Sequence, residues 1–252
     1  MVKQSLLLLG LFYFFTSACS AKDTILEPEA LYWFPSIDGI IQNADNNLSG
    51  TKIKLKDDLG IKDEEFPDLR LTWHTGPNSR LRLTSMTVDY SGSTNLSKNV
   101  AFGGVNYSAG IAVNTDLQVE HANLGWTWQF LNFFNDSLKL GTVFETTFLK
   151  MDAAIAAGST RETDGFSIVF PTIGGAFDWL AMERLRLSLQ ITGMSAGNHG
   201  YFINGELGVK YLAFKHFTVE TGYRMIDVTY KNKQDKANLR LAGPYLGATV
   251  RF

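Results

Sequence analysis

Residues 185–191 read LRLSLQI. Leucine or isoleucine occupies every second position, and arginine, serine and glutamine fill the positions between them. Successive side chains of a β-strand point to opposite faces, so this segment predicts a strand with one apolar and one polar face. Residues 67–74 (PDLRLTWH) and 203–211 (INGELGVKY) alternate in the same way. The pattern therefore predicts an all-β protein.

About ten such segments follow one another along the chain, and several reach the length of about 9–11 residues at which a tilted strand crosses a bilayer. They lie near residues 30–42, 66–75, 80–91, 110–130, 138–156, 165–180, 184–195, 200–213, 217–231 and 238–252. Within residues 80–91 the apolar positions change phase, from Leu81 and Leu83 to Met86 and Val88. This change predicts a β-bulge between the two pairs.

The composition excludes two classes of protein. The chain is 45% hydrophobic and only 19% charged, but it has no long apolar run after its N-terminal segment, so a bundle of transmembrane helices is excluded. The net charge is −2 and the pI about 6.1, which gives no electrostatic footprint for nucleic acid. Hydrophobic residues spread over every second position account for a mean hydropathy of −0.04.

The connections between the segments differ in length. Short ones are expected at 75–79, 131–137, 181–184 and 213–216. Longer polar ones are expected at 43–65, 92–109, 157–164, 195–200 and 231–237. Short turns at one end and long loops at the other are typical of outer-membrane barrels. We therefore predict an antiparallel up-and-down transmembrane β-barrel of about ten strands, within a range of 8–12.

All five tryptophans are expected at the short-turn end of this barrel, where they would form an interfacial aromatic belt. They are Trp33, Trp73, Trp126, Trp128 and Trp179. Tyr90, Phe166, Tyr201 and Tyr230 are expected to form a second belt at the other end.

Met1 to Ala21 has the pattern of a secretory signal peptide. Lys3 precedes an apolar run at 6–15 (LLLLGLFYFF), which is too short to span a bilayer, and small residues follow it. Cleavage after Ala21 leaves a single barrel domain at 22–252; cleavage before Cys19 with lipidation of that cysteine is the alternative. Cys19 is the only cysteine, so the first alternative leaves no disulfide and no thiol.

The chain ends in PYLGATVRF, with Leu246, Ala248, Val250 and Phe252 at alternate positions. A last strand of this kind, ending in phenylalanine, resembles the C-terminal signature of bacterial outer-membrane β-barrels. The chain is similar to small barrels of the OmpA, OmpX and OmpW types, and no motif selects one of them. The resemblance implies a Gram-negative outer membrane and an assembly signal in Phe252, Val250 and Ala248 that the barrel assembly machinery recognises.

Few residues suggest catalysis. Ser195 and His199 share the segment SAGNHG, and Glu206 could orient the histidine, as in a lipid A deacylase or phospholipase. His74 is a further candidate base. The spacing matches no hydrolase motif, and Gly197 and Gly200 favour an ordinary turn.

The 43–65 segment contains DNNLSG, whose Asp45, Asn47, Ser49 and Gly50 fit the opening of a calcium loop. The twelfth position of that loop should be glutamate and is Lys56, which rejects an EF-hand. An acidic cluster in the same segment could hold a divalent cation or contact lipopolysaccharide, although a solvated loop is favoured. Its members are Asp57, Asp58, Asp63, Glu64 and Glu65.

Charged residues on the faces opposite the apolar ones are expected to fill the lumen. They are Asp68, Arg70, Arg82, Glu120, Glu145, Arg186, Glu206, Lys210, Glu220, Arg224 and Arg251. Their mixed signs favour a salt-bridged plug, because a selective pore would carry one dominant sign.

Three functions follow in order of preference. The first is a monomeric barrel of structural or small-porin type that contacts outer-membrane lipid and lipopolysaccharide, without cofactor or nucleic acid. The second is a barrel enzyme acting on lipid. The third is a soluble secreted β-sandwich or lipocalin-like binder, in which Leu69, Leu71, Leu185, Leu187 and Leu189 would face an inner core.

Overall fold

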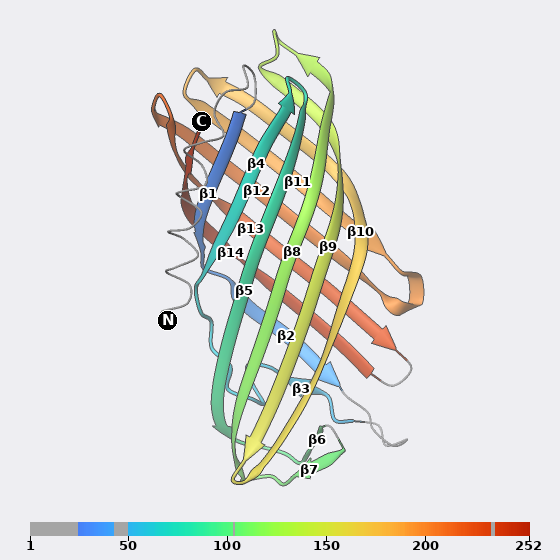
Figure 1. Ribbon diagram of the computed structural model, residues 1–252. Helices are drawn as coiled ribbons and strands as arrows, with labels where there is room; N and C mark the ends of the chain where they lie inside the picture. Colours follow the sequence, from blue (N-terminus) through green and yellow to red (C-terminus); the bar gives the residue numbers. More distant parts are fainter. Residues whose placement is uncertain (1–24, 43–49, 103, 233–234) are drawn as a thin grey trace.

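In the computed structural model, residues 25–42, 50–102, 104–232 and 235–252 are described, and ten of their strands form one closed antiparallel barrel (Figure 1). The barrel strands are β1 (Ile25–Trp33), β4 (Phe66–Gly76), β5 (Ser79–Asn95), β8 (Ala112–Phe133), β9 (Leu138–Ala157), β10 (Thr160–Met182), β11 (Leu185–Ser195), β12 (Gly200–Phe214), β13 (Phe217–Asn232) and β14 (Asp235–Val250). Each pairs with its neighbour in this order, and β1 closes on β14 through the register Glu29↔Thr249 to Trp33↔Tyr245. The predicted all-β barrel is confirmed.

The remaining elements lie at one end of this barrel. The strand β2 (Ser36–Gln42) continues β1 along β14, and it pairs on its other edge with β3 (Ile53–Lys54). A small hairpin joins β6 (Val100–Phe102) to β7 (Val105–Tyr107), and a 3-10 turn, η1, covers Gly197–His199. No helix among the described residues is long and apolar enough to cross a membrane. The predicted signal peptide, with Cys19, lies outside the described residues, as do Asp45, Asn47 and Ser49.

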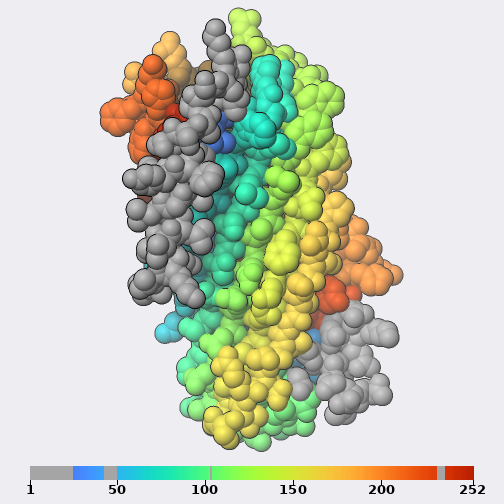
Figure 2. Space-filling view, in the orientation of Figure 1, coloured from blue at the N-terminus to red at the C-terminus, as the bar shows by residue number. Residues whose placement is uncertain are grey.

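The two ends of the barrel differ mainly in strand length. The short turns lie together at the end that also holds the C-terminus (Figure 1, top), as predicted. The long loops predicted at 157–164 and 231–237 are wrong, because β9 and β10 pair as far as Ala157↔Thr160, and β13 and β14 pair as far as Asn232↔Asp235. The strands themselves extend instead: β8 and β10 have 22 and 23 residues, whereas β11 has 11. The β9–β10 turn lies at the other end of the barrel (Figure 2, bottom).

Along β5 the inward and outward faces exchange polarity. Near the short turns, the outward Leu83 is 50% exposed and the inward position before it is Arg82. Further along the same strand, Val88 is inward and fully buried, while Asp89 is outward and exposed. Pairing with β8 runs from Ser79 to Asn95, through both regions, without a register shift, and pairing with β4 is regular from Arg80 to Met86. The phase change at 81–88 therefore reflects a change in which face of the strand is apolar, from the outward face to the inward face. The β-bulge predicted there is wrong.

The same exchange divides the barrel into two parts. Near the short turns lies an apolar band, whose outward residues are exposed and apolar: Leu69, Leu83, Leu124, Trp126, Phe144, Ile173, Leu189, Leu207, Val219, Tyr223 and Leu246. Beyond it lies a part that we call the head, with an inward apolar core that includes Val88, Tyr90, Leu117, Val119, Met151 and Ile155. An apolar exterior suits lipid, and an apolar interior with a polar exterior suits water.

The exchange corrects three sequence expectations. Glu120 was expected in the lumen, but it shares the outward face of β8 and pairs with Lys150 on the outside, at 3.0 Å. Trp33 and Tyr90 were expected in aromatic belts, but both are buried inside the barrel. In each case the sequence prediction assumed that apolar residues face outward along the whole strand. This is true only in the apolar band. Trp73, Trp126, Trp128 and Trp179 are exposed near the short turns, as the belt requires.

The segment 53–61 completes the wall of the head between β2 and β5. The Leu55 backbone N–H donates to the Gly39 carbonyl at 3.0 Å, and Ile61 pairs with Gly92 of β5. A Cβ at Gly92 would lie 2.5 Å from the Leu59 carbonyl oxygen, so only glycine admits the crossing. Leu55 and Leu59 are buried in the core of the head.

The boundary of the apolar band can be tested with two arginines on one face of one strand. We expect Leu83→Arg to cost about 2–4 kcal/mol of unfolding free energy in lipid, because Leu83 faces the band, and Thr87→Arg to cost about 0–1 kcal/mol, because Thr87 faces water. Denaturant unfolding in lipid vesicles measures both. Equal costs would contradict the proposed boundary.

Candidate functional site

An ionic network fills the lumen at the level of the apolar band. Because the outward positions of these strands are apolar, the alternate positions carry polar side chains toward the barrel axis. Six of the ten strands contribute the charged members: Glu29, Asp68, Arg70, Arg82, Glu145, Glu206, Lys210, Glu220 and Arg224. Side chains from strands far apart in sequence therefore meet in the centre of the barrel.

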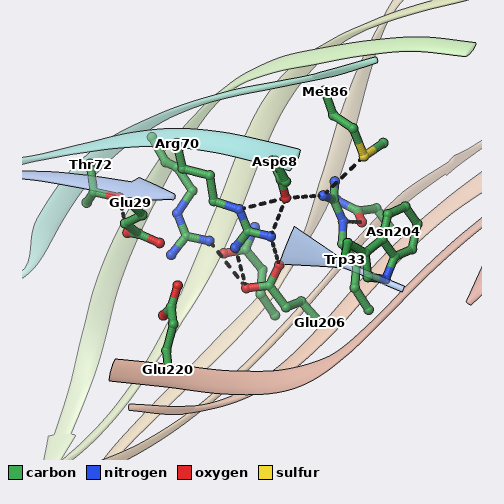
Figure 3. Close-up of polar contacts among 12 residues, drawn as sticks. Glu29, Trp33, Asp68, Arg70, Thr72, Met86, Asn204, Glu206 and Glu220 are labelled. Carbon is green, nitrogen blue, oxygen red and sulfur yellow. Dashed lines mark hydrogen bonds and ion pairs between the residues drawn. The ribbon is translucent and has the colours of Figure 1, made fainter. Parts of the chain in front are cut away.

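The centre of the network is a chain of ion pairs around Asp68 (Figure 3). Arg70 donates through two nitrogens to Glu206 on the opposite wall, with Nη1–Oε1 at 2.8 Å and Nη2–Oε2 at 2.7 Å. Asp68 Oδ2 accepts from Arg70 Nη2 at 2.7 Å and from Arg224 Nη1 at 2.5 Å. Arg82 stands 3.9 Å from Glu206. Paired, bidentate geometry of this kind is what a buried charge requires.

A second group of ion pairs lies nearer the short turns. Lys210 Nζ is 2.8 Å from Glu220 and 3.4 Å from Glu29, so one cation bridges two carboxylates from opposite sides of the β1–β14 closure. The Thr72 hydroxyl donates to Glu29 Oε1 at 3.0 Å. These residues bring together β1, β4, β12 and β13, and they tie the closing strands to the rest of the wall.

Glu145 is held by neutral donors. Thr192 Oγ1 donates to it at 2.7 Å, Gln190 Nε2 at 2.9 Å and Thr172 Oγ1 at 3.2 Å. Gly125 on the adjacent β8 leaves room for the carboxylate, because a Cβ there would stand 3.1 Å from Glu145 Cγ. The carboxylate therefore links β9 to the next two strands of the wall, β10 and β11.

Aromatic rings close the network on the side of the head. The Arg224 guanidinium lies over the Trp33 ring at 5.3 Å, and the Arg70 guanidinium lies over the Tyr245 ring at 5.7 Å. Trp33 Nε1 donates to the Gly243 carbonyl at 3.0 Å, which fixes the ring. His121 stacks on Phe202 with centroids 6.2 Å apart, where the ionic network meets the apolar core.

Almost no space remains in the network. The cavity among Arg70, Arg82, Glu145, Glu206 and Arg224 has a volume of about 10 Å³. One water molecule needs about 10–15 Å³ by this kind of measure. The described side chains therefore leave no room there for a column of water.

The lumen residues expected from the sequence divide into three groups. Asp68, Arg70, Glu145, Glu220 and Arg224 are buried inside, and Arg82, Glu206 and Lys210 are partly buried beside them. Arg186 and Arg251 lie at the short-turn mouth. Glu120, as shown above, is outside.

Further charged groups were missed, among them Glu29 and Asp178. Glu29 shares its strand face with Leu31 and Trp33, so the alternation hid it on a face that looked apolar. Asp178 shares its face with Ala176, and it ion-pairs with Arg80 at 3.1 Å. A search for charges of opposite sign at inward positions of neighbouring strands could have found both.

The catalytic candidates do not assemble into a triad. Ser195 Oγ accepts from the Gly197 backbone N–H at 3.3 Å, and both Ser195 and His199 are exposed at the β11–β12 turn. Glu206 is committed to Arg70 inside the barrel. His74 stands 3.2 Å from Glu27 near the short turns, far along the barrel from the other two.

The acidic residues of the 53–65 segment are paired with lysines of the head. Asp57 contacts Lys54 at 3.0 Å, Asp63 contacts Lys56 at 2.8 Å, and Asp58 contacts Lys98 at 2.7 Å. Within the described part of the chain, no three His, Cys, Asp or Glu side chains are grouped so that they could hold a metal ion. These ion pairs anchor the segment, and this structural role accounts for Asp57, Asp58 and Asp63 of the predicted acidic cluster. The other two members, Glu64 and Glu65, follow Asp63 directly in the sequence.

The ionic network can be compared with an ion pair on the outside. We expect Asp68→Asn to cost about 3–5 kcal/mol of unfolding free energy, because it leaves Arg70 and Arg224 buried with one fewer counter-charge. The matched change Glu120→Gln removes an exposed ion pair and should cost less than about 1 kcal/mol. Denaturant unfolding of the refolded protein measures both, and similar costs would contradict the burial of Asp68.

The contacts of Asp58 with Lys98 and with the Lys54 backbone predict that the stability of the 53–61 segment depends on pH. Burial opposes ionisation of Asp58, but hydrogen bonds from Lys98 Nζ and the Lys54 backbone N–H prevail and hold its pKa below the ordinary value of 3.8. The anchor is therefore present at neutral pH and is lost as the pH falls below 3.8 through the folded-state pKa.

We expect hydrogen exchange of residues 53–61, corrected for the intrinsic rate, to accelerate in that acidic range. Asp58→Asn should already exchange faster at neutral pH and should lose the acidic transition. An unchanged transition in Asp58→Asn would assign it to another group.

Comparison with known proteins finds solved structures with a similar fold. No family model matches the sequence, and no characterised protein matches it. Among solved structures, the outer membrane protease OmpT of Escherichia coli superposes with a TM-score of 0.59 at 12% identity, covering 94% of this chain and 100% of that one. The attachment invasion locus protein Ail of Yersinia pestis gives a TM-score of 0.38 at 10% identity, with 91% and 99% covered. At this identity the likeness concerns the fold alone: the chain shares the closed antiparallel β-barrel fold of the OmpT structure.

Proposed function

We propose that this protein is a monomeric integral barrel of a Gram-negative outer membrane and that it is of the structural type, with a lumen closed to solutes. The observation that carries the proposal is the ionic network, whose residual cavity has a volume of about 10 Å³. The apolar band would face the lipid, and the head would stand outside the membrane on the side opposite the short turns.

The charges of the network support closure rather than selective conduction. Four cations (Arg70, Arg82, Lys210 and Arg224) face five carboxylates (Glu29, Asp68, Glu145, Glu206 and Glu220). A selectivity filter carries charge of one sign around an open path. Here the signs compensate one another across the lumen, and a passage for ions would require several ion pairs to separate together.

The head supports a role in presenting a stable surface. Its core is apolar and continuous, whereas its exterior carries charged side chains such as Lys150, Asp152 and Arg161. Of these outward charges, Lys150 and Asp152 lie nearer the apolar band, at the level where lipopolysaccharide head groups would meet the barrel, whereas Arg161 stands at the β9–β10 turn. Lipopolysaccharide therefore remains the expected lipid partner.

Export and assembly follow from the two ends of the chain. We expect the N-terminal segment to direct export and the assembly machinery to bind the last strand. Val250 and Phe252 are exposed, and the Phe252 backbone N–H donates to the Leu26 carbonyl at 3.0 Å. Exposed side chains at the barrel seam are consistent with recognition during closure. No specific observation favours the lipid-hydrolysing alternative.

Single-channel recording tests closure. We expect the wild-type barrel in planar bilayers to give no conductance steps above the leak, because the lumen holds no water path. The triple variant Arg70→Ala, Arg82→Ala and Glu206→Ala removes the central side chains and should produce steps. A control with Glu120→Ala and Lys150→Ala, both outside the lumen, should remain silent.

Folding of every variant is checked by the difference in gel migration between boiled and unboiled samples. Wild-type steps of porin size would overturn the proposed closure. They would favour the small-porin alternative.

A further inference from the structure

The short-turn end of the barrel contains a vestibule that the ionic network does not fill. It has a volume of about 550 Å³, within the range of about 300–1,000 Å³ typical of small-molecule sites. Its lining includes residues of the turns that join β4 to β5 and β8 to β9, with Leu180 of β10 and Arg186 of β11. These turns are at the upper end of the barrel in Figure 1. Gln129 and Asp178 line its inner side.

Four cationic side chains from four different segments line this vestibule: Arg80 of β5, Lys139 of β9, Arg186 of β11 and Arg251 after β14. Two of them have carboxylate partners. Arg80 stands 3.1 Å from Asp178, and Arg251 stands 3.4 Å from Glu27. The other lining carboxylate, Asp136, lies on the β8–β9 turn.

The remaining donors lack an anionic acceptor. Lys139 donates only to neutral oxygens, the Pro77 carbonyl at 3.0 Å and Asn78 Oδ1 at 2.9 Å. Arg186 makes no hydrogen bond or ion pair within the described part of the chain; the Asp178 carboxylate acts on it only electrostatically, from a position held by Arg80 and Gln129. Lys139 of β9 and Arg186 of β11 thus present two cations without a carboxylate at ion-pair distance to one cavity.

We propose that the vestibule binds an oxyanion, a phosphate or carboxylate group, from the side of the membrane on which the short turns lie. Guanidinium and ammonium groups bind such groups through short, charge-assisted hydrogen bonds. The Arg186 guanidinium and the Lys139 ammonium would supply the charge and the hydrogen-bond donors. The oxyanion belongs either to a free ion or to the end of a larger molecule, since the vestibule is open at its mouth.

Calorimetry on the refolded full-length barrel in zwitterionic detergent tests the proposal at low and at high salt. The probes are inorganic phosphate, citrate, and a short peptide with either a free or an amidated C-terminus. Binding of phosphate or citrate that weakens with salt supports a free ion. Binding of the free peptide without binding of its amide supports the end of a larger molecule. No binding of any probe at low salt overturns the proposal.

The matched variants are Arg186→Gln and Arg184→Gln, two residues apart at the same turn. Arg184 does not line the vestibule. We expect Arg186→Gln to weaken binding about tenfold, the loss of one charge-assisted hydrogen bond, and Arg184→Gln to leave it unchanged. Lys139→Gln provides a second test if Arg186→Gln does not fold. Equal affinity in the vestibule variants and the control would overturn the assignment. Because the vestibule opens to solvent, binding is measured whether or not the barrel conducts.

Discussion

A β-strand has two faces, and a strand that passes from lipid into water must exchange the polarity of both. This constraint organises the whole barrel. On β5 the outward face changes from Leu83 to Asp89 while the inward face changes from Arg82 to Val88, without a break in pairing. The same exchange along β8 and β9 produces two interiors in one continuous wall: an ionic one beside the apolar band and an apolar one in the head.

The ionic interior is a consequence of that exchange. Once the outward positions of the band are apolar, the inward ones must hold the polar groups, and buried charge is tolerated only when it is paired and hydrogen-bonded. The bidentate contact of Arg70 with Glu206, and the Asp68 carboxylate shared by Arg70 and Arg224, meet this requirement. Filling the lumen in this way also closes it, so stability and impermeability arise from the same side chains.

Sequence patterns predicted the strands better than the facing of their side chains. Nine of the ten segments each correspond to one barrel strand, and segment 30–42 is divided between the end of β1 and β2. The strands were predictable because a period of two is a local property. Glu120 was misplaced and Glu29 was missed for one reason: alternation identifies two faces but does not say which one lies inside. The grouping of Arg80, Lys139 and Arg186 at the vestibule could not be predicted from the sequence either, because only closure of the barrel brings these residues together.

The sequence by itself determined the period, the approximate strand ends and the apolar, cysteine-free last strand, because each depends on residues close together in the chain. Only the tertiary structure decided which face of each strand meets lipid, water or the barrel axis, because that depends on where the strand leaves the apolar band. It also decided which charges pair, since Asp68 and Arg224 lie 156 positions apart and meet across the lumen. Pairing of this kind is set by strand register and tilt around the closed barrel.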